Sequence, residues 1–191
     1  MPEKRKKSTA PNAESKRGGK PRDTNEFSET VLNVRRVSKV VKGGRRLSFS
    51  ALVVVGDQKG RVGVATGKGR EVASAISKAV RAARKSMFAV PLYGATLPFT
   101  VEAKFGACHV LLRSASKGTG VIAGGAVRAV MEALGVHDVL GKSIGSSNSN
   151  GVAKATIVAL QKLRSATHIA KLRGLNLNEM VGMAGGKNVQ A

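Results

Sequence analysis

Strand-like patterns of apolar and polar residues fill the first third of the chain after a polar start. The segment VLNVRRVSKVV (residues 31–41) is rich in β-branched residues, but its alternation slips, which indicates a bulge or a twist. The segment LSFSALVVVG (residues 47–56) alternates cleanly, with Leu47, Phe49, Ala51, Val53 and Val55 on one face. We expect a two-residue hairpin loop at Gly43 and Gly44, because tight hairpins need positive φ angles. A third strand is predicted over residues 61–66, after a turn at Gly60.

A helix is predicted over residues 71–88, where apolar residues recur at helical spacing. The residues on its apolar face are Val72, Ile76, Ala79, Val80, Ala83 and Met87, and basic residues lie on the other side. Pro91 and Gly94 end this unit. The first module is therefore predicted to be a β-β-β-α unit, one antiparallel sheet backed by one helix.

A second module is predicted over residues 94–165. The segments LPFTVEAKFG and ACHVLLRSAS indicate a hairpin that turns near Gly106. A helix follows with Val127, Val130, Met131 and Leu134 facing inward, and then a short strand in VHDVLGKSIG. The polar segment SSNSNG offers N-cap side chains for a second helix that runs to Leu163. The order is β-β-α-β-α, so we predict an α+β protein with two small domains, residues 27–93 and 94–165.

The two ends of the chain differ from these modules. Residues 1–22 hold eight Lys or Arg and two Glu, and they lack Val, Leu, Ile and Phe. Such a segment cannot bury enough apolar surface to offset its ordering entropy. We therefore predict a flexible basic arm over residues 1–26, which either contacts RNA or only aids solubility. Residues 166–191 are predicted to be a loose tail with one short helix around residues 178–183.

Composition favours a protein that binds polyanions. The chain has 33 Lys and Arg against 11 Asp and Glu, a net charge of +22 over 191 residues. Aromatic residues make up only 3%, so contacts are expected mainly with the phosphate backbone and not by stacking on bases. Cys108 is the only cysteine, which excludes an internal disulfide and fits a reducing compartment. No stretch approaches the roughly 20 apolar residues of a membrane span, so we predict a cytoplasmic protein with no membrane association.

The segment SASKGTGVIAGGAVRAVMEALG (residues 114–135) holds a motif that resembles a cofactor site. Gly118, Gly120 and Ala123 match G-x-G-x-x-A between a strand and a helix, as in dinucleotide pockets. Such pockets need a parallel βαβ sheet and an acidic residue about 20 positions further on. Here a hairpin precedes the loop and Asp138 falls inside a predicted strand, so no cofactor is predicted. The glycines instead permit a tight turn and close backbone approach, or present free N–H groups to RNA phosphates.

The sequence indicates no active site. The segment TGKGRE (residues 66–71) lacks the Walker spacing, and the histidines show no metal-ligand spacing with Cys108. Cys108 and His109 are adjacent on a predicted strand, so they point to opposite faces and cannot form a dyad. No carboxylate pair stands out in the second module. We predict a non-enzymatic protein without a bound metal.

Basic residues gather in the first module. The predicted RNA-binding residues there are Arg35, Arg36, Lys39, Lys42, Arg45, Arg46, Lys59, Arg61, Lys68 and Arg70. Basic side chains on exposed strand edges also prevent edge-to-edge aggregation, and that role accounts for a few of them. It does not account for ten cations with Asp57 as the only acid between Val31 and Arg70. Contact with RNA phosphates, and recognition of folded RNA by its shape, is the prediction.

Two long segments resemble one known family. The stretch from Asn33 to Ala79, NVRRVSKVVKGGRRLSFSALVVVGDQKGRVGVATGKGREVASAISKA, resembles the N-terminal domain of the ribosomal protein S5 family of the bacterial small subunit. SASKGTGVIAGGAVRAVMEALGVHDVLGKSIGSSNSNGVAKAT resembles its C-terminal domain. The resemblance covers roughly residues 27–164. It implies a double-stranded-RNA-binding-like first domain and a second domain of the fold named after this family.

The resemblance also implies a function in translation. Members of the family bind 16S ribosomal RNA, touch the fourth and eighth small-subunit proteins, lie by the messenger RNA entry path and influence decoding accuracy. The family's extended loop corresponds to residues 37–46, which places Ser38, Lys39, Gly43, Gly44 and Arg45 near RNA. The loop from Gly118 to Gly125 matches the family's second-domain signature. Lys117, Gly118 and Gly120 complete the predicted RNA-binding residues. Small-molecule kinases share the second-domain fold, but this loop lacks their serine pair, so it resembles a phosphate cradle by fold and not by activity.

Two alternatives stay open at this point. A free-standing double-stranded-RNA-binding protein or RNA chaperone would explain the charge and the first module, but it leaves the second module without a purpose. A nucleotide-dependent enzyme built on the glycine loop would show saturable binding of ATP or NAD.

Overall fold

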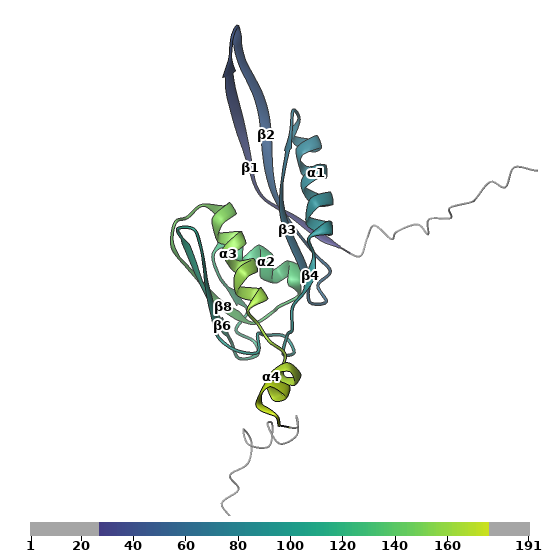
Figure 1. Ribbon diagram of the computed structural model, residues 1–191, viewed down its shortest axis with the longest axis vertical. Coiled ribbons are helices and arrows are strands. Elements are labelled where there is room, and N and C mark those ends of the chain that lie inside the picture. The colour runs from purple at the N-terminus through teal and green to yellow at the C-terminus, as the bar shows by residue number, and fades with distance from the viewer. Residues whose placement is uncertain (1–26, 176–191) are drawn as a thin grey trace, which may run out of the picture.

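The computed structural model describes residues 27–175 as two four-stranded sheets with helices packed on them (Figure 1). In chain order the elements are β1 (Ser28–Val41), β2 (Gly44–Gly56), β3 (Arg61–Gly69), α1 (Val72–Lys85), β4 (Phe88–Ala89), β5 (Val101–Phe105), β6 (Cys108–Ser114), β7 (Val121–Ile122), α2 (Gly125–Leu134), β8 (Val139–Gly145), α3 (Ser149–Gln161) and α4 (Ala166–Arg173). The predicted α+β class is confirmed. The predicted basic arm at residues 1–26 and the predicted helix around residues 178–183 lie outside the described residues.

The first sheet is an antiparallel meander in the order β1-β2-β3-β4. The predicted irregularity in the first strand is confirmed, because the register with β2 shifts between Val31 and Asn33. The predicted hairpin loop is wrong by one residue. The turn consists of Lys42 and Gly43, while Gly44 pairs with Val41. Only the second turn residue needs a positive φ here, and Gly43 provides it at +87°.

The β1–β2 hairpin extends beyond the rest of the first sheet, as Figure 1 shows. β3 pairs with β2 only from Phe49 to Gly56, so the part of β2 before Phe49 has β1 as its single neighbour. We call residues 37–48 the free ribbon, and residues 34–36 together with 49–50 its base. No helix or third strand among residues 27–175 covers the ribbon, and nearly all its side chains are exposed.

α1 covers one face of the first sheet at unusually short range. Ala75, Ala79 and Ala83 are fully buried against the β2 face of Ala51, Val53 and Val55, which confirms the predicted strand face. The predicted helix face is partly wrong, because Val72 is exposed. The reason is the close contact with β3. An added Cβ at Gly63 or Gly67 would overlap a carbonyl oxygen of α1, so only alanines fit at the centre of the contact.

The second sheet has the order β5-β6-β8-β7, and α2 and α3 pack on it. The predicted hairpin is confirmed, with its turn at Gly106 (φ +59°). β7 was not predicted, since its two residues are too few to show a period, and it pairs parallel with β8.

The predicted loose tail is wrong over α4. The hydroxyl of Ser165 accepts a hydrogen bond from the backbone N–H of His168, and Gly174 ends the helix in the left-handed conformation. This serine and glycine pair is a helix start and stop signal that is readable in the sequence.

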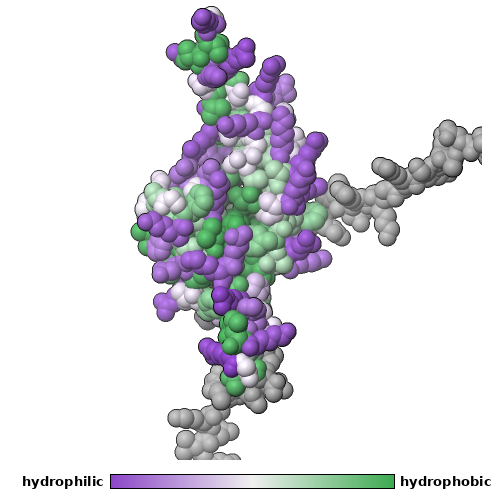
Figure 2. All heavy atoms as spheres, in the orientation of Figure 1, coloured by the Kyte–Doolittle hydropathy of each residue, from purple (hydrophilic) through white to green (hydrophobic). Residues whose placement is uncertain are grey.

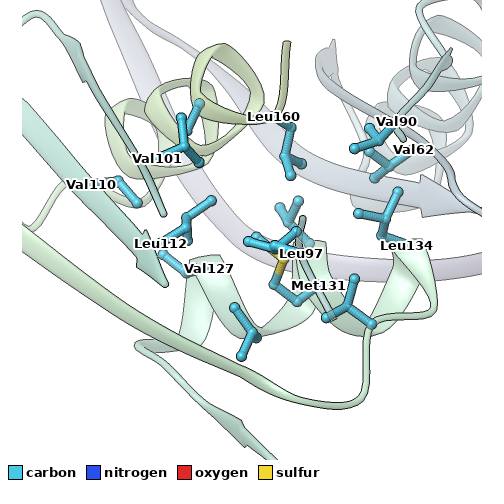
Figure 3. Close-up of a cluster of buried hydrophobic side chains, with 14 of the residues drawn as sticks. Val62, Val90, Leu97, Val101, Val110, Leu112, Val127, Met131, Leu134 and Leu160 are labelled. Atoms are coloured by element: carbon cyan, nitrogen blue, oxygen red, sulfur yellow. The ribbon is translucent and has the colours of Figure 1, made fainter. Parts of the chain in front are cut away.

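The second face of the first sheet packs against the second module. Val62 and Val90 of the first module lie in the same buried cluster as Leu97, Met131 and Leu134 (Figure 3). The sequence analysis predicted one covering helix for this sheet, and α2 is a second one. The division of the chain at residues 93 and 94 stays a prediction, while the hydrophobic core is continuous across it.

The turn between β2 and β3 also caps α2. The backbone N–H of Gln58 donates to the carbonyl oxygen of Ala133 over 3.1 Å, and that of Gly60 donates to Leu134 over 3.0 Å. Carbonyl groups at a helix C-terminus lack partners within the helix, so the first module satisfies two that α2 leaves free. The two modules are therefore joined by hydrogen bonds as well as by apolar packing.

Candidate nucleic-acid interface

The free ribbon and its base carry most of the predicted RNA-binding residues. They are Arg35, Arg36, Ser38 and Lys39 on β1, Lys42 and Gly43 in the turn, and Gly44, Arg45 and Arg46 on β2. All are exposed, and residues 34–50 contain six Lys or Arg and no Asp or Glu. Figure 2 shows the hydrophilic side chains projecting along this part of the molecule, with apolar ones between them. The ribbon is a positively charged projection that is open to a polyanion on both faces.

Cations project from both faces of the ribbon because of the strand period. Paired residues of an antiparallel ladder point to the same face, and successive residues point to opposite faces. Lys39 pairs with Arg46 and therefore shares one face with it. Arg45 pairs with Val40 and lies on the other face. The adjacent pair Arg45 and Arg46 thus supplies one cation to each face.

Four further predicted residues lie at two opposite ends of the first sheet. Lys68 pairs with Ser50 at the base of the ribbon, and Arg70 follows directly after β3. Lys59 and Arg61 lie at the other end of β2, where both backbone N–H groups donate to the carboxylate of Asp57 over 2.9 Å. A strand rises about 3.3 Å per residue, so Gly56 at this end of β2 lies roughly 26 Å from Ser48, where the ribbon ends. The structure therefore separates Lys59 and Arg61 from the ribbon.

The glycine loop before α2 binds an internal carboxylate. The backbone N–H groups of Gly118 and Gly120 donate to Oδ1 of Asp138 over 3.0 and 2.9 Å, and Asp138 is only 5% exposed. The interpretation that these N–H groups are free to bind phosphate is therefore wrong. The loop also does not open the helix, because β7 lies between it and Gly125. Contact of Lys117, Gly118 and Gly120 with RNA stays a prediction. It would have to use groups of the loop other than the N–H groups of Gly118 and Gly120, which already bind Asp138.

The positive φ angles of Gly118 (+92°) and Gly120 (+77°) explain why glycine stands at these positions. Close approach of another backbone segment does not explain the two glycines, since an added Cβ at either residue would meet nothing within 4 Å.

Replacement of Asp138 by alanine is expected to lower the free energy of unfolding by about 2 to 3 kcal/mol, because the N–H groups of Gly118 and Gly120 lose a charged acceptor in a partly buried site. Asp138→Asn keeps an acceptor oxygen at the same position, so its effect should be clearly smaller. Urea unfolding of both variants, followed by far-UV circular dichroism, measures the difference. Equal stability of the wild type and Asp138→Ala would contradict this role for the carboxylate.

The base of the ribbon meets the start of α3 in a polar junction. A guanidinium nitrogen of Arg35 donates to Oδ1 of Asn148 over 3.1 Å. Asn148 belongs to the segment that was expected to cap α3 and is the N-cap residue. Its side chain makes no cap hydrogen bond and bonds Arg35 instead. A small cavity of about 90 Å³ adjoins this contact and is lined by Asn33, Arg35, Ser50, Leu52, Thr66 and Asn150. Oδ1 of Asn150 is buried, and residues 27–175 provide it with no hydrogen-bond partner.

Asn148 and Asn150 were missed as interface residues by the sequence analysis. The signal was the SSNSNG segment, which was interpreted only as a source of helix caps. No pattern in the sequence indicates that α3 begins beside the base of the hairpin.

The described residues show no arrangement typical of a metal site or a catalytic dyad. Within residues 27–175, no three His, Cys, Asp or Glu side chains lie close enough to hold a metal ion. Cys108 is buried, whereas His109 lies on the opposite, partly exposed face, 3.5 Å from the carboxylate of Glu102. None of the described helices has the length and apolar character needed to cross a membrane.

Two segments of the chain match the two domain models of one known family. Residues 27–91 match the family model described as ribosomal protein S5, N-terminal domain, and residues 103–173 match ribosomal protein S5, C-terminal domain. A relative from Syntrophobacter fumaroxidans, named small ribosomal subunit protein uS5, is 55% identical over 152 residues, which is 80% of this chain and 92% of the relative. A protein of the same name from Lawsonia intracellularis is 56% identical over 148 residues, 78% of this chain and 91% of the relative.

Proposed function

Because the chain belongs to the ribosomal protein S5 family and is thus a structural constituent of the small ribosomal subunit, we propose that it binds 16S ribosomal RNA through the free ribbon. The proposal includes a place beside the messenger RNA entry path, with an effect on assembly and on the accuracy of translation. It also includes contacts with the fourth and eighth small-subunit proteins. The protein acts in the cytoplasm as a part of the ribosome and not as an enzyme.

One observation carries the proposal, namely the exposed ribbon with six cations and no acid at its tip and base. Cations that approach phosphates release condensed counterions, and this release favours binding to any nucleic acid. This charge effect does not determine where on the RNA the cations bind, so their position has to be fixed by the fold. The ribbon is held by α1 on one side of its base and by the junction with α3 on the other, so the charges are presented in a defined direction.

The glycine loop gives no support to the alternative of a nucleotide-dependent enzyme. A dinucleotide site uses free backbone N–H groups at a helix N-terminus to hold the pyrophosphate. Here Asp138 accepts the N–H groups of Gly118 and Gly120 and would repel a pyrophosphate at the same place. Asp138, the acidic residue that follows the motif, therefore binds the protein's own backbone and not a ligand.

Sedimentation of a gentle cell lysate through a density gradient tests the proposed function. The chain should migrate with the small ribosomal subunit and stay with it at moderate salt. Migration at the top of the gradient would contradict the proposal and would favour a free RNA chaperone. Saturable binding of ATP or NAD to the purified chain would instead support the enzymatic alternative.

A further inference from the structure

A small cavity of about 90 Å³ lies between the base of the ribbon and the start of α3. The first sheet lines it with two neighbouring cross-strand rows. Paired residues of an antiparallel ladder, and residues two apart on one strand, point to the same face. The rows are Asn33, Leu52 and Thr66, and Arg35 with Ser50. Asn150 of α3 also lines the cavity, which therefore lies between the two modules.

One acceptor beside this cavity lacks a donor among the described residues. Oδ1 of Asn150 is buried, and no group of residues 27–175 donates a hydrogen bond to it. Buried polar atoms of native proteins are nearly always hydrogen-bonded, either to the protein or to ordered water. The last torsion of an asparagine side chain is soft, so this oxygen can turn toward a donor in the cavity. The buried amide therefore indicates that the cavity holds a molecule that donates hydrogen bonds.

The chemistry of the lining favours water over other occupants. An anion would be repelled by the carbonyl oxygen of Asn150. A metal cation would lie beside the guanidinium of Arg35, and none of the six lining residues is an acid that could bind it. An apolar group would leave the buried acceptor without a hydrogen bond. Water is a neutral donor, and the cavity of about 90 Å³ has room for about three molecules at the volume that each takes in the liquid.

Polar side chains of the first module supply the other partners that such water needs, since a buried water makes about three hydrogen bonds. The hydroxyls of Ser50 and Thr66 and the amide of Asn33 come from the first sheet. We propose that ordered water in this cavity bridges Oδ1 of Asn150 to these side chains, as an internal hydration site between the two modules.

The bridging water and the direct bond between Arg35 and Asn148 form one polar joint under the ribbon, because Arg35 also lines the cavity. Elsewhere the two modules share an apolar core, which includes Met131 and Leu134. A water-mediated contact is enthalpically nearly as favourable as a direct hydrogen bond, so water can join the two modules where their side chains do not meet. The inference concerns the chain by itself and goes beyond the proposed function, on which it does not depend.

A crystal structure of the full wild-type chain, at a resolution that shows ordered water, tests the site directly and needs no variant. Density for water should lie about 2.5 to 3.0 Å from Oδ1 of Asn150 and at a similar distance from at least one polar side-chain atom of Asn33, Ser50 or Thr66. A cavity without ordered water, or a hydrogen bond from another protein group to Oδ1, would overturn the inference. Density for a bound ion would overturn it too.

A thermodynamic cycle tests the bridge in solution. Asn150→Ala removes the acceptor, and Ser50→Ala with Thr66→Val removes the two hydroxyls with little change of shape. Urea unfolding of the wild type, of each variant and of their combination gives four unfolding equilibrium constants. Groups that share a bound water are coupled, so the effect of the combination should differ at least threefold from the product of the separate effects.

The matched control combines Asn150→Ala with Ser38→Ala and Thr100→Val, which remove two exposed hydroxyls that do not line the cavity. The effects in this control should multiply, because the sites share no partner. Independent effects of Asn150→Ala and the Ser50 and Thr66 substitutions would overturn the inference. The proposed function would still stand in that case, since it is tested separately by sedimentation with the small ribosomal subunit.

Discussion

Replacement of Lys42, Arg45 and Arg46 together by alanine should weaken binding to 16S ribosomal RNA by about 100- to 500-fold at 0.1 M salt. Each phosphate contact contributes about 0.7 to 0.9 to the slope of log affinity against log salt, so three contacts correspond to roughly 2.1 to 2.7 decades at this concentration. The slope itself should fall by about 2 to 3. Titration of the chain into 16S ribosomal RNA with the other small-subunit proteins, at several salt concentrations, measures both quantities.

The matched control for this variant removes the same charge from another surface. Lys104, Arg113 and Lys142 are exposed on the outer face of the second sheet, and their joint replacement by alanine also lowers the net charge by three. Long-range attraction is screened over about 10 Å at this ionic strength, so the control should bind almost as tightly as the wild type. Equal losses in the variant and the control would mean that the total charge, and not the ribbon, determines binding.

Replacement of Gly56 by alanine should lower the free energy of unfolding by about 3 kcal/mol and the unfolding midpoint by roughly 10 °C. An alanine Cβ at this position would overlap the carbonyl oxygen of Ala133, which belongs to α2 in the second module. The same carbonyl accepts the N–H of Gln58, so the turn cannot shift away without the loss of a hydrogen bond. The strain therefore falls on the contact through which the two modules share their core. Differential scanning calorimetry and urea unfolding measure it.

Gly125→Ala is the appropriate comparison for Gly56→Ala. Gly125 is the first residue of α2, its φ is not positive, and an added Cβ would meet nothing within 4 Å. Alanine also favours the helix over glycine, so this variant should be as stable as the wild type or slightly more stable. If Gly56→Ala were equally stable, the packing of α2 against the β2–β3 turn would be contradicted.

The strands of the first sheet could be predicted because local rules determine them. Alternation along residues 47–56 identified the face that α1 covers. The slip in the preceding strand indicated an irregularity there but not its position between Val31 and Asn33. The predicted turn was displaced by one residue, because the sequence has two adjacent glycines and does not indicate which of them takes the turn conformation that Gly43 adopts. The helix face was rotated for a different reason. The hydrophobic pattern places Val72 and Ile76 on the buried face of α1. The close approach of the helix to Gly63 and Gly67 instead leaves room only for alanines at the centre of that face.

The sequence analysis predicted which basic residues form the candidate interface. It did not predict which of them lie together in the structure. Composition and the absence of acids identify residues 34–50 as a strongly basic segment, because charge is a sum over the sequence and does not depend on the fold. The separation of Lys59 from the ribbon depends on the length of β2. The pairing of Arg35 with Asn148 joins residues 113 positions apart, and no periodic signal indicates such a contact.

The sequence by itself determined the classes of element, the sign and location of the charge and the family to which this chain belongs, because each of these depends on neighbouring residues or on simple sums. Tertiary structure alone decided what the local pattern leaves open. It placed α2 on the second face of the first sheet, turned Asp138 inward to bind the glycine loop and left both faces of the ribbon uncovered by the rest of residues 27–175. These outcomes depend on which segments, distant in the sequence, come into contact. That contact determines which side chains are buried, how closely the backbones approach and which partners the polar groups find.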